Sequence, residues 1–259
     1  QKITDILTQT GVDEVDIIAH STGGLLVKKY VVENPEDNHI DKAVFVGVPN
    51  TGAPKAFKAL IQGDNFGNLL VADSEMKKIS ANLPVAYDLS PSEQYFNIKG
   101  SYAKIIDQYA FSNKPRDLDF EESNIFLIDD HKLNAHALVN AHNLPTADFD
   151  NYDLRPAGID LYAIDGCKAG TIGKFIEARF HGLLGGENYI VSNFKIEETP
   201  GDGTVPLESA TNLPINTENK FYALQGKHST MMTQDGTRQQ IVNIISGGAL
   251  PTQDIFIQD

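Results

Sequence analysis

Two short apolar runs with a helix-like segment between them constrain the fold of this chain most. Residues 15–19 and 43–48 are buried-strand candidates, and the second run closes on a Pro/Asn/Gly turn. Between them, "LLVKKYVVENP" has helical spacing and ends before Pro35. A strand, a helix and a strand at this spacing predict a βαβ unit, and therefore a parallel sheet covered by helices on both faces.

Further segments extend this pattern in both directions. "KITDILTQTG" predicts a short amphipathic helix that stops at Gly11, and "DGTRQQIVNIISGG" predicts a last helix. Strands are predicted at "GIDLYAIDG", "NYIVSNFKIE" and "NKFYALQG". Between residues 57 and 153 the strand pattern lapses into helical and loop segments, which we interpret as an insertion. The predicted organisation is a core of residues 1–56 and 154–259 interrupted by an insertion of residues 57–153.

Composition excludes several classes of function. The 259 residues are 41% hydrophobic and 22% charged, which is usual for a globular protein, and no apolar run is long enough to cross a bilayer. The formal net charge of −14 repels phosphodiester backbones, so nucleic acid is not an expected partner. The sole cysteine, Cys167, has no partner for an internal disulfide and is expected to be a buried thiol.

The first residues, "QKITDILTQTG", contain neither an initiator methionine nor the basic and apolar regions of a signal peptide. A soluble chain is predicted, but its first residues do not distinguish a cytoplasmic from a secreted protein.

Ser21 lies where the first buried strand gives way to the helix, and this position has two interpretations. A serine at a helix start commonly acts as an N-cap, with its side-chain oxygen accepting a free amide of the first turn. Alternatively, Ser21 is the nucleophile of a strand–turn–helix elbow, which requires small residues two positions before and after it. Ala19 and Gly23 meet that requirement, although the pattern is A-x-S-x-G rather than G-x-S-x-G.

Residues downstream of Ser21 favour the nucleophile. The only histidine after residue 181 is His228, in "LQGKHSTMM", directly after a predicted strand. Asp202 lies between them in "EETPGDGTVPLESA", flanked by glycines that allow a turn presenting its carboxylate. Asp202 has a plainer interpretation as a turn residue or a calcium ligand, but "GDGT" lacks the alternating oxygen ligands of a calcium loop. The order serine, acid, histidine is that of an α/β-hydrolase catalytic triad.

With these residues in place, the chain resembles a lipase-type α/β-hydrolase of the lecithin:cholesterol acyltransferase-like group. The matching segments run in family order to about Met232: "DIIAHSTGGLLVKKY", "VFVGVPNTGAPKA", "NLPVAYDLSPSEQYF", "IDLYAIDG", "GDGTVPLESA" and "GKHSTMM". "GDGTVP" ahead of a histidine is the most specific of them, and "NLPVAYDLSPS" resembles the cap segment of bacterial members.

The resemblance implies a mainly parallel α/β-hydrolase sheet with a cap or lid formed by the insertion. It implies Ser21 as the nucleophile, Asp202 as the acid and His228 as the general base. The backbone N–H of Thr22 is then one oxyanion donor. The chemistry proceeds through an acyl-enzyme that water or an acceptor alcohol resolves, and it needs no cofactor or metal.

One departure from the family pattern concerns the second oxyanion donor. In this fold it comes from a loop after a strand upstream of the nucleophile, whereas only one helix and one strand precede Ser21 here. Either the early strands, missing from this chain, are supplied by an upstream segment or a separate chain, which is the interpretation we favour, or this domain is truncated and impaired. A sheet that ended at the nucleophile strand would expose a long apolar edge.

Several other residues are weighed for a role in binding. His20 is interpreted either as a substrate contact or as a packing residue beside the elbow. His131, His136 and His142 are five and six positions apart within one predicted helical stretch, so they do not share a helix face and a zinc site is not expected. "AFKALIQGDNFGNLLV" is interpreted as part of a lid that lines an acyl pocket, or as ordinary packing.

The sequence thus predicts a serine carboxylester hydrolase that acts on a lipid or another hydrophobic acyl ester, with capacity for acyl transfer. An amidase or peptidase with the same triad is the alternative among enzymes, because ester and amide hydrolysis use the same groups. A catalytically silent hydrolase-fold binding protein is the alternative from another class. Acyl chain length, acceptor and oligomeric state depend on the cap and on the missing strands, and are not predicted.

Overall fold

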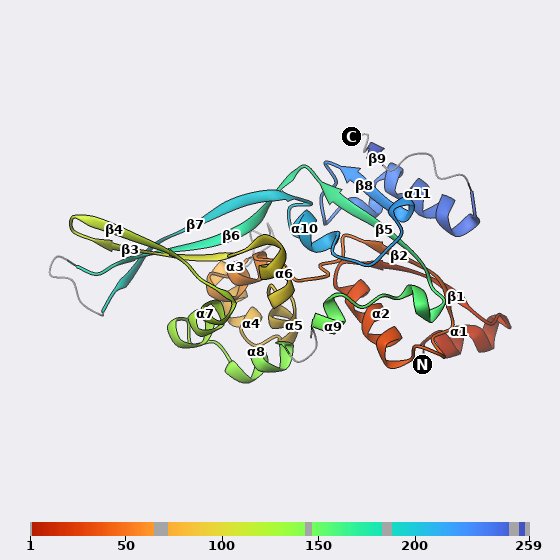
Figure 1. Cartoon of the computed structure of the whole chain (residues 1–259), viewed down its shortest axis with the longest axis horizontal. Coiled ribbons are helices and arrows are strands. Elements are labelled where there is room, and N and C mark those ends of the chain that lie inside the picture. Colours follow the sequence, from red (N-terminus) through yellow and green to blue (C-terminus); the bar gives the residue numbers. More distant parts are fainter. Residues whose placement is uncertain (1, 65–71, 143–146, 183–187, 249–253, 257–259) are drawn as a thin grey trace. The chain divides into compact units, whose positions relative to one another are not determined.

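The computed structural model describes residues 2–64, 72–142, 147–182, 188–248 and 254–256. The chain divides into two compact units, whose elements are labelled in Figure 1. The first unit comprises Gln1–Asn50, Asp148–Gly170 and Pro200–Asp259, and the second comprises Thr51–Ala147 and Thr171–Thr199.

A five-stranded sheet forms the centre of the first unit. Its strand order is β1 (Val15–His20), β2 (Ile40–Val46), β5 (Asp160–Cys167), β8 (Lys220–Leu224) and β9 (Asp254–Phe256). All four neighbouring pairs are parallel, so the predicted parallel α/β fold is confirmed. The register places Ala19 opposite Phe45 and Phe45 opposite Ala163. Cys167, at the end of β5, is buried as expected.

Helices cover both faces of this sheet, because successive residues of a strand point to opposite sides. On one face, Phe45 of β2 packs in a core cluster with Val31 of α2. On the other face, Val44 of the same strand packs in a second cluster with Ile241 and Ile244 of α11. The helices of the first unit are α1 (Lys2–Thr10), α2 (Thr22–Glu33), α10 (Leu207–Ala210) and α11 (Asp235–Ser246), with α9 (Ala147–Asp150) at the unit boundary and the short helices η2 (Arg155–Ala157), η3 (Thr217–Asn219) and η4 (Met231–Thr233).

A four-stranded sheet and a group of helices form the second unit. The strand order is β4 (Ser112–Asp117), β3 (Ala103–Tyr109), β6 (Ala169–Phe180) and β7 (Ile190–Gly201). β3 and β4 are an antiparallel hairpin, while β3 and β6 are parallel. The helices are α3 (Lys55–Ile61), α4 (Asp73–Ser80), α5 (Pro84–Asp88), α6 (Glu93–Lys99), α7 (Phe120–Ile125), the π-helix η1 (Phe126–Asp130) and α8 (Ala135–His142). Aromatic residues are prominent in their shared core, including Phe57, Tyr87, Tyr95, Tyr102, Phe126 and Phe175.

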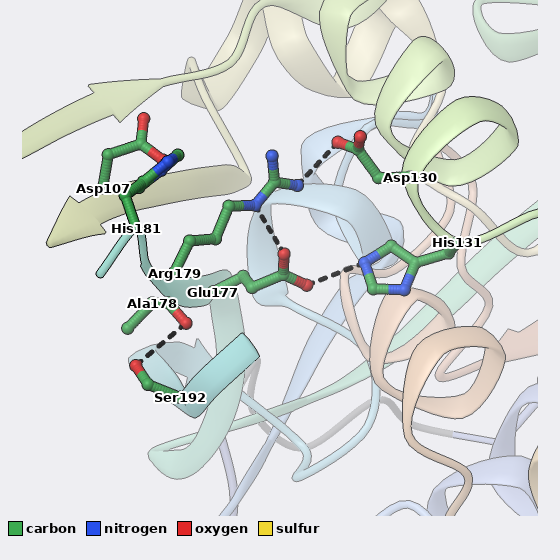
Figure 2. A network of polar contacts seen from close by, with 8 residues as sticks. All are labelled: Asp107, Asp130, His131, Glu177, Ala178, Arg179, His181 and Ser192. Atoms are coloured by element: carbon green, nitrogen blue, oxygen red, sulfur yellow. Dashed lines mark hydrogen bonds and ion pairs between the residues drawn. The ribbon is translucent and has the colours of Figure 1, made fainter. Parts of the chain in front are cut away.

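A buried ionic network joins β6 to the helices of the second unit (Figure 2). The Glu177 carboxylate lies 2.7 Å from Nε of Arg179 and 2.7 Å from Nε2 of His131. The Arg179 guanidinium also donates to Asp130 at 2.6 Å. Glu177 is fully buried, and a buried carboxylate is tolerated only when cationic and hydrogen-bonding partners surround it. Part of the packing of this sheet against its helices is therefore polar.

The observed division of the chain differs from the predicted one. The insertion was expected to be one segment of helices and loops, yet the second unit contains the β3–β4 hairpin and also takes up residues 171–199. β7 is a strand as predicted, but it belongs to the second sheet. The reason lies at Lys168, where a single residue of positive φ, 67°, separates β5 from β6, so the chain passes from one sheet directly into the other.

Candidate active site

Ser21 occupies a tight turn between β1 and α2. Its φ of 56° and ψ of −133° lie in a region that residues with a Cβ atom rarely adopt. Two backbone hydrogen bonds hold the turn: the Ser21 N–H donates to the Val46 carbonyl at 3.0 Å, and the Ser21 carbonyl accepts from Gly24 at 3.0 Å. The Ser21 side chain makes no capping hydrogen bond to α2. The N-cap interpretation of this side chain is therefore wrong.

The small residues around Ser21 differ in how much space they require. A Cβ atom added to Gly23 would lie 4.0 Å from the Ala19 methyl, which is ordinary contact, so the alanine two positions before Ser21 fits without a clash. Gly24 is more constrained, because a Cβ there would lie 2.3 Å from Cγ2 of Val48. Helix α2 thus starts in close contact with Val48, two residues after β2, and Gly24 is a requirement that the sequence motif does not identify.

The three residues predicted as nucleophile, acid and base lie together at the carboxyl ends of the strands. Asp202 directly follows β7, and His228 lies in the loop after β8. Nε2 of His228 is 2.8 Å from Oγ of Ser21, and Nδ1 of His228 is 2.7 Å from Oδ2 of Asp202. At these distances an imidazole can accept the hydroxyl proton on Nε2, while the carboxylate holds the hydrogen on Nδ1.

The Asp202 carboxylate is buried and held by the backbone of its own turn. Its Oδ1 accepts hydrogen bonds from the N–H groups of Thr204 at 2.9 Å and Val205 at 2.7 Å, while Oδ2 faces His228. The Asp202 carbonyl also accepts the His228 N–H at 2.8 Å. Gly203, with a φ of 88°, allows the turn, as expected from the flanking glycines. The two loops are therefore joined by both backbone and side-chain contacts.

Two glycines that sequence reasoning missed lie against this pair. A Cβ on Gly47, whose φ is 56°, would lie 3.0 Å from Oδ2 of Asp202 and 3.4 Å from Nδ1 of His228. A Cβ on Gly166 would lie 2.5 Å from Cβ of Asp202. Gly47 directly follows a buried strand in "VFVGV", and Gly166 lies near the end of another buried strand in "AIDG". A place at the end of a buried strand is the sequence signal that distinguishes these glycines from turn glycines.

His20 and Thr22 flank the serine on either side. Nε2 of His20 lies 3.0 Å from the backbone carbonyl of His228, and the two imidazole rings are 4.7 Å apart. Burial, and then the proximity of His228, lower the pKa of His20. Thr22 is the first residue of α2, where a backbone N–H has no acceptor within its own helix.

Other predicted positions lie elsewhere or outside the described residues. His131 follows η1 and pairs with Glu177, whereas His136 and His142 belong to α8, so the three histidines do not share one helix. Among the described residues, no group of three histidine, cysteine or acidic side chains has the arrangement of a metal site. A helix long and apolar enough to cross a membrane is also not found in the described part of the chain.

The segment predicted as a lid is only partly described. Residues 65–71 lie outside the described residues. In the preceding helix, α3, the side chains of Phe57, Leu60 and Ile61 pack in the core of the second unit. Packing is therefore the observed role of these three side chains.

Comparison with known proteins gives one family. The family model described as lecithin:cholesterol acyltransferase matches residues 1–238, which include Ser21, Asp202 and His228. A solved structure described as the crystal structure of the Tle4-Tli4 complex is similar at 17% identity, over 81% of this chain and 53% of that chain, with a TM-score of 0.48. The chain thus spans about half the length of that solved protein. No curated protein matches the sequence.

The family match extends across both segments that carry the predicted site. It starts before the turn at Ser21 and ends ten residues after His228, at residue 238. A match over this length shows the family of the chain, and the parallel sheet with helices on both faces agrees with an α/β-hydrolase fold. The chain belongs to the lecithin:cholesterol acyltransferase family.

Proposed function

We propose that this chain is a serine hydrolase that cleaves carboxylic esters of lipids or other hydrophobic acyl groups. The observation that carries the proposal is the unbroken series of contacts from Ser21 Oγ to His228 Nε2, at 2.8 Å, and from His228 Nδ1 to Asp202 Oδ2, at 2.7 Å. Membership of an acyltransferase family supports an acyl group as the unit that is transferred. The strained φ of Ser21 supports the nucleophile role, because such strain is concentrated at functional sites.

In the proposed reaction, Nε2 of His228 accepts the Ser21 hydroxyl proton as Oγ attacks the ester carbonyl carbon. The tetrahedral intermediate collapses when the bond to the leaving oxygen breaks and His228 returns the proton to the departing alcohol. Water, or an acceptor alcohol, then attacks the acyl-enzyme with His228 again as the base. Asp202 keeps the hydrogen on Nδ1, which leaves Nε2 as the acceptor that the first step needs.

Two donors are proposed to stabilise the oxyanion. One is the N–H of Thr22 at the start of α2. The other is proposed to come from outside the described residues, on a loop that follows a strand of the same or another chain, with that strand joining the sheet beside β1. β1 forms one edge of the described sheet, and the backbone groups on the outer side of an edge strand can pair with a further strand.

Labelling with a fluorophosphonate probe, mapped by mass spectrometry, tests the nucleophile directly. We expect covalent labelling at Ser21, and we expect His228→Ala to slow it by about 1,000-fold or more, because the base then no longer activates the hydroxyl. The same labelling on the product of the whole gene tests whether a further segment completes the oxyanion site. Absence of labelling in both folded proteins would contradict the proposal and favour a silent binding protein.

Matched substrates separate ester from amide hydrolysis. We expect turnover of a long-chain ester and little turnover of the amide with the same acyl group. Ser21→Ala should abolish turnover and keep ligand affinity within about threefold, because the substitution removes one oxygen from the site. Faster turnover of the amide would replace the ester hydrolase with an amidase.

A further inference from the structure

One side chain, His20, contacts both the backbone and the ring of His228. His20 is the last residue of β1 and directly precedes Ser21. Its Nε2 lies 3.0 Å from the His228 carbonyl oxygen. The two rings are 4.7 Å apart at an interplanar angle of 36°, so the ring of His20 also supports the imidazole of His228.

The first contact defines the state of His20. A carbonyl oxygen only accepts hydrogen bonds, so Nε2 of His20 must carry the hydrogen. Burial, and then the proximity of His228, keep the pKa of His20 below its usual value, while the His228 carbonyl and the Asp202 charge oppose this shift. His20 is therefore a neutral imidazole with its hydrogen on Nε2 at neutral pH, and it adds no positive charge beside His228.

The loop that carries His228 is held at both sides of this residue. Its N–H donates to the Asp202 carbonyl at 2.8 Å, and its carbonyl accepts from His20. The loop follows β8 through Gln225, which has a positive φ of 64°, so its path is not that of a relaxed strand. Without the His20 contact, only the Asp202 side of the residue would remain fixed by these hydrogen bonds.

From these contacts we propose that His20 is a positioning residue for His228. It holds the backbone and ring of the base at the distance from which Nε2 reaches Oγ of Ser21. Since His20 and Ser21 are adjacent, the same strained turn fixes the nucleophile and, through His20, the base. This inference rests on the proposed function, because positioning matters for catalysis only if His228 acts as a base.

Two substitutions separate the two contacts of His20. His20→Phe keeps an aromatic ring next to His228 and removes the donor. His20→Gln keeps an N–H at nearly the reach of Nε2 and removes the ring. We expect His20→Phe to lower kcat on a long-chain ester by about tenfold or more while KM stays within about twofold, because one hydrogen bond to a partly buried acceptor is lost. His20→Gln should recover most of this loss, and His39→Phe, at an exposed histidine, is the matched control.

A measurement that does not need turnover keeps the two proposals apart. The Nδ1–H of His228, bonded to Asp202, should give a separate downfield proton resonance. We expect His20→Phe to broaden or abolish this resonance, with the resonance and the thermal stability retained in His20→Gln. These changes without Ser21 labelling would support the positioning role and contradict the hydrolase. An unchanged resonance and kcat in His20→Phe, or an equal loss of kcat in both variants with an unchanged resonance, would overturn the positioning role.

Discussion

At the scale of single residues, Ser21 keeps a backbone conformation that is costly for any residue with a Cβ atom. The conformation persists because its N–H and carbonyl are both bonded within the first unit, to Val46 and Gly24. The motif around Ser21 and the order of the later acid and histidine were enough to predict the three residues that lie together. The sequence did not predict Gly47, Gly166 or the contact made by His20, because these depend on which loops meet in space.

Gly47 offers a direct test of how closely the acid and base are packed. Gly47 and Gly158 both have positive φ, 56° and 85°, so alanine costs each a similar backbone strain of about 1 kcal/mol. Only at Gly47 would the new Cβ approach Asp202 and His228. We expect Gly47→Ala to slow Ser21 labelling by about 100-fold, the effect of displacing a catalytic group by about 1 Å, while Gly158→Ala labels normally. Equal labelling rates in the two variants would contradict this close packing.

Asp165 is a fully buried carboxylic acid on β5, and its Oδ2 has no hydrogen-bond partner among the described residues. Burial raises its pKa from 3.8 to about 7; the Asp202 charge adds to this and Lys220 opposes it. The pKa of Asp165 is higher in the folded state than in the unfolded state. Between these two pKa values, the folded protein therefore holds a proton on Asp165 that the unfolded protein has released. The stability that this proton contributes is present below about pH 4 and is lost as pH rises through about 7.

Asp165→Asn should therefore flatten the pH dependence of stability. The free energy of unfolding of the unsubstituted protein should fall between about pH 5 and about pH 8. The fall is roughly 1.4 kcal/mol for each pH unit over which the folded state still holds the Asp165 proton that the unfolded state has released. Denaturant unfolding at the two pH values measures the change. Asp5→Asn, at an exposed position of α1, should leave the slope intact. The assignment to Asp165 fails if its substitution also leaves the slope unchanged.

At the scale of elements, β1, β2, β5, β8, α2 and α11 were predictable because each carries apolar side chains that pack in the core clusters of the first unit. α1 was predictable from its helical spacing although none of its residues is buried, whereas the three-residue strand β9 was not predicted. β4 was not, since all its side chains are exposed and it contains Pro115. β6 was missed for a different reason. Its apolar pattern is interrupted by Glu177 and Arg179, which are buried because Asp130 and His131 accompany them from a distant part of the chain. A pairing between distant residues leaves no mark on local periodicity.

The buried position of Glu177 predicts a large effect of its substitution. Glu177→Gln leaves Arg179 with one carboxylate fewer and removes the charge that faces His131 (Figure 2). We expect a loss of about 3 kcal/mol in the free energy of unfolding of the second unit. Glu122→Gln is the matched control, because Glu122 also pairs with an arginine, Arg116, but its side chain is 41% exposed. That control should cost less than about 1 kcal/mol.

Denaturant unfolding with hydrogen exchange along β6 measures both variants. Exchange in β6 should speed up in Glu177→Gln and stay unchanged in Glu122→Gln. Similar small losses in both would mean that the buried network contributes no more than a surface pair.

At the scale of the whole molecule, the two compact units do not follow the single linear insertion that the sequence predicts. The chain leaves the first unit twice, after Asn50 and after Gly170, and returns at Asp148 and Pro200. Apolar periodicity predicts that a segment is a strand but not which sheet the strand joins. It therefore did not predict that β7 belongs to the second sheet. The parallel order of the first unit was more predictable, because a segment with helical spacing connects its first two strands.

Net charge is a second property of the whole molecule. The sequence has 35 acidic and 21 basic residues, which gives the formal charge of −14. Such an excess creates a negative field around the protein at low ionic strength. For an enzyme that acts on an ester in a lipid surface, this field opposes approach to anionic headgroups and leaves approach to zwitterionic ones unaffected.

The charge therefore predicts how salt changes the proposed activity. We expect a hydrophobic ester to be hydrolysed more slowly in phosphatidylglycerol vesicles than in phosphatidylcholine vesicles. The difference should shrink as salt rises from about 0.02 M to about 0.5 M, because the screening length falls well below the size of the protein. A neutral water-soluble ester controls for direct effects of salt on the site. A faster rate on anionic vesicles would mean that a local basic surface, rather than the net charge, governs approach to the lipid.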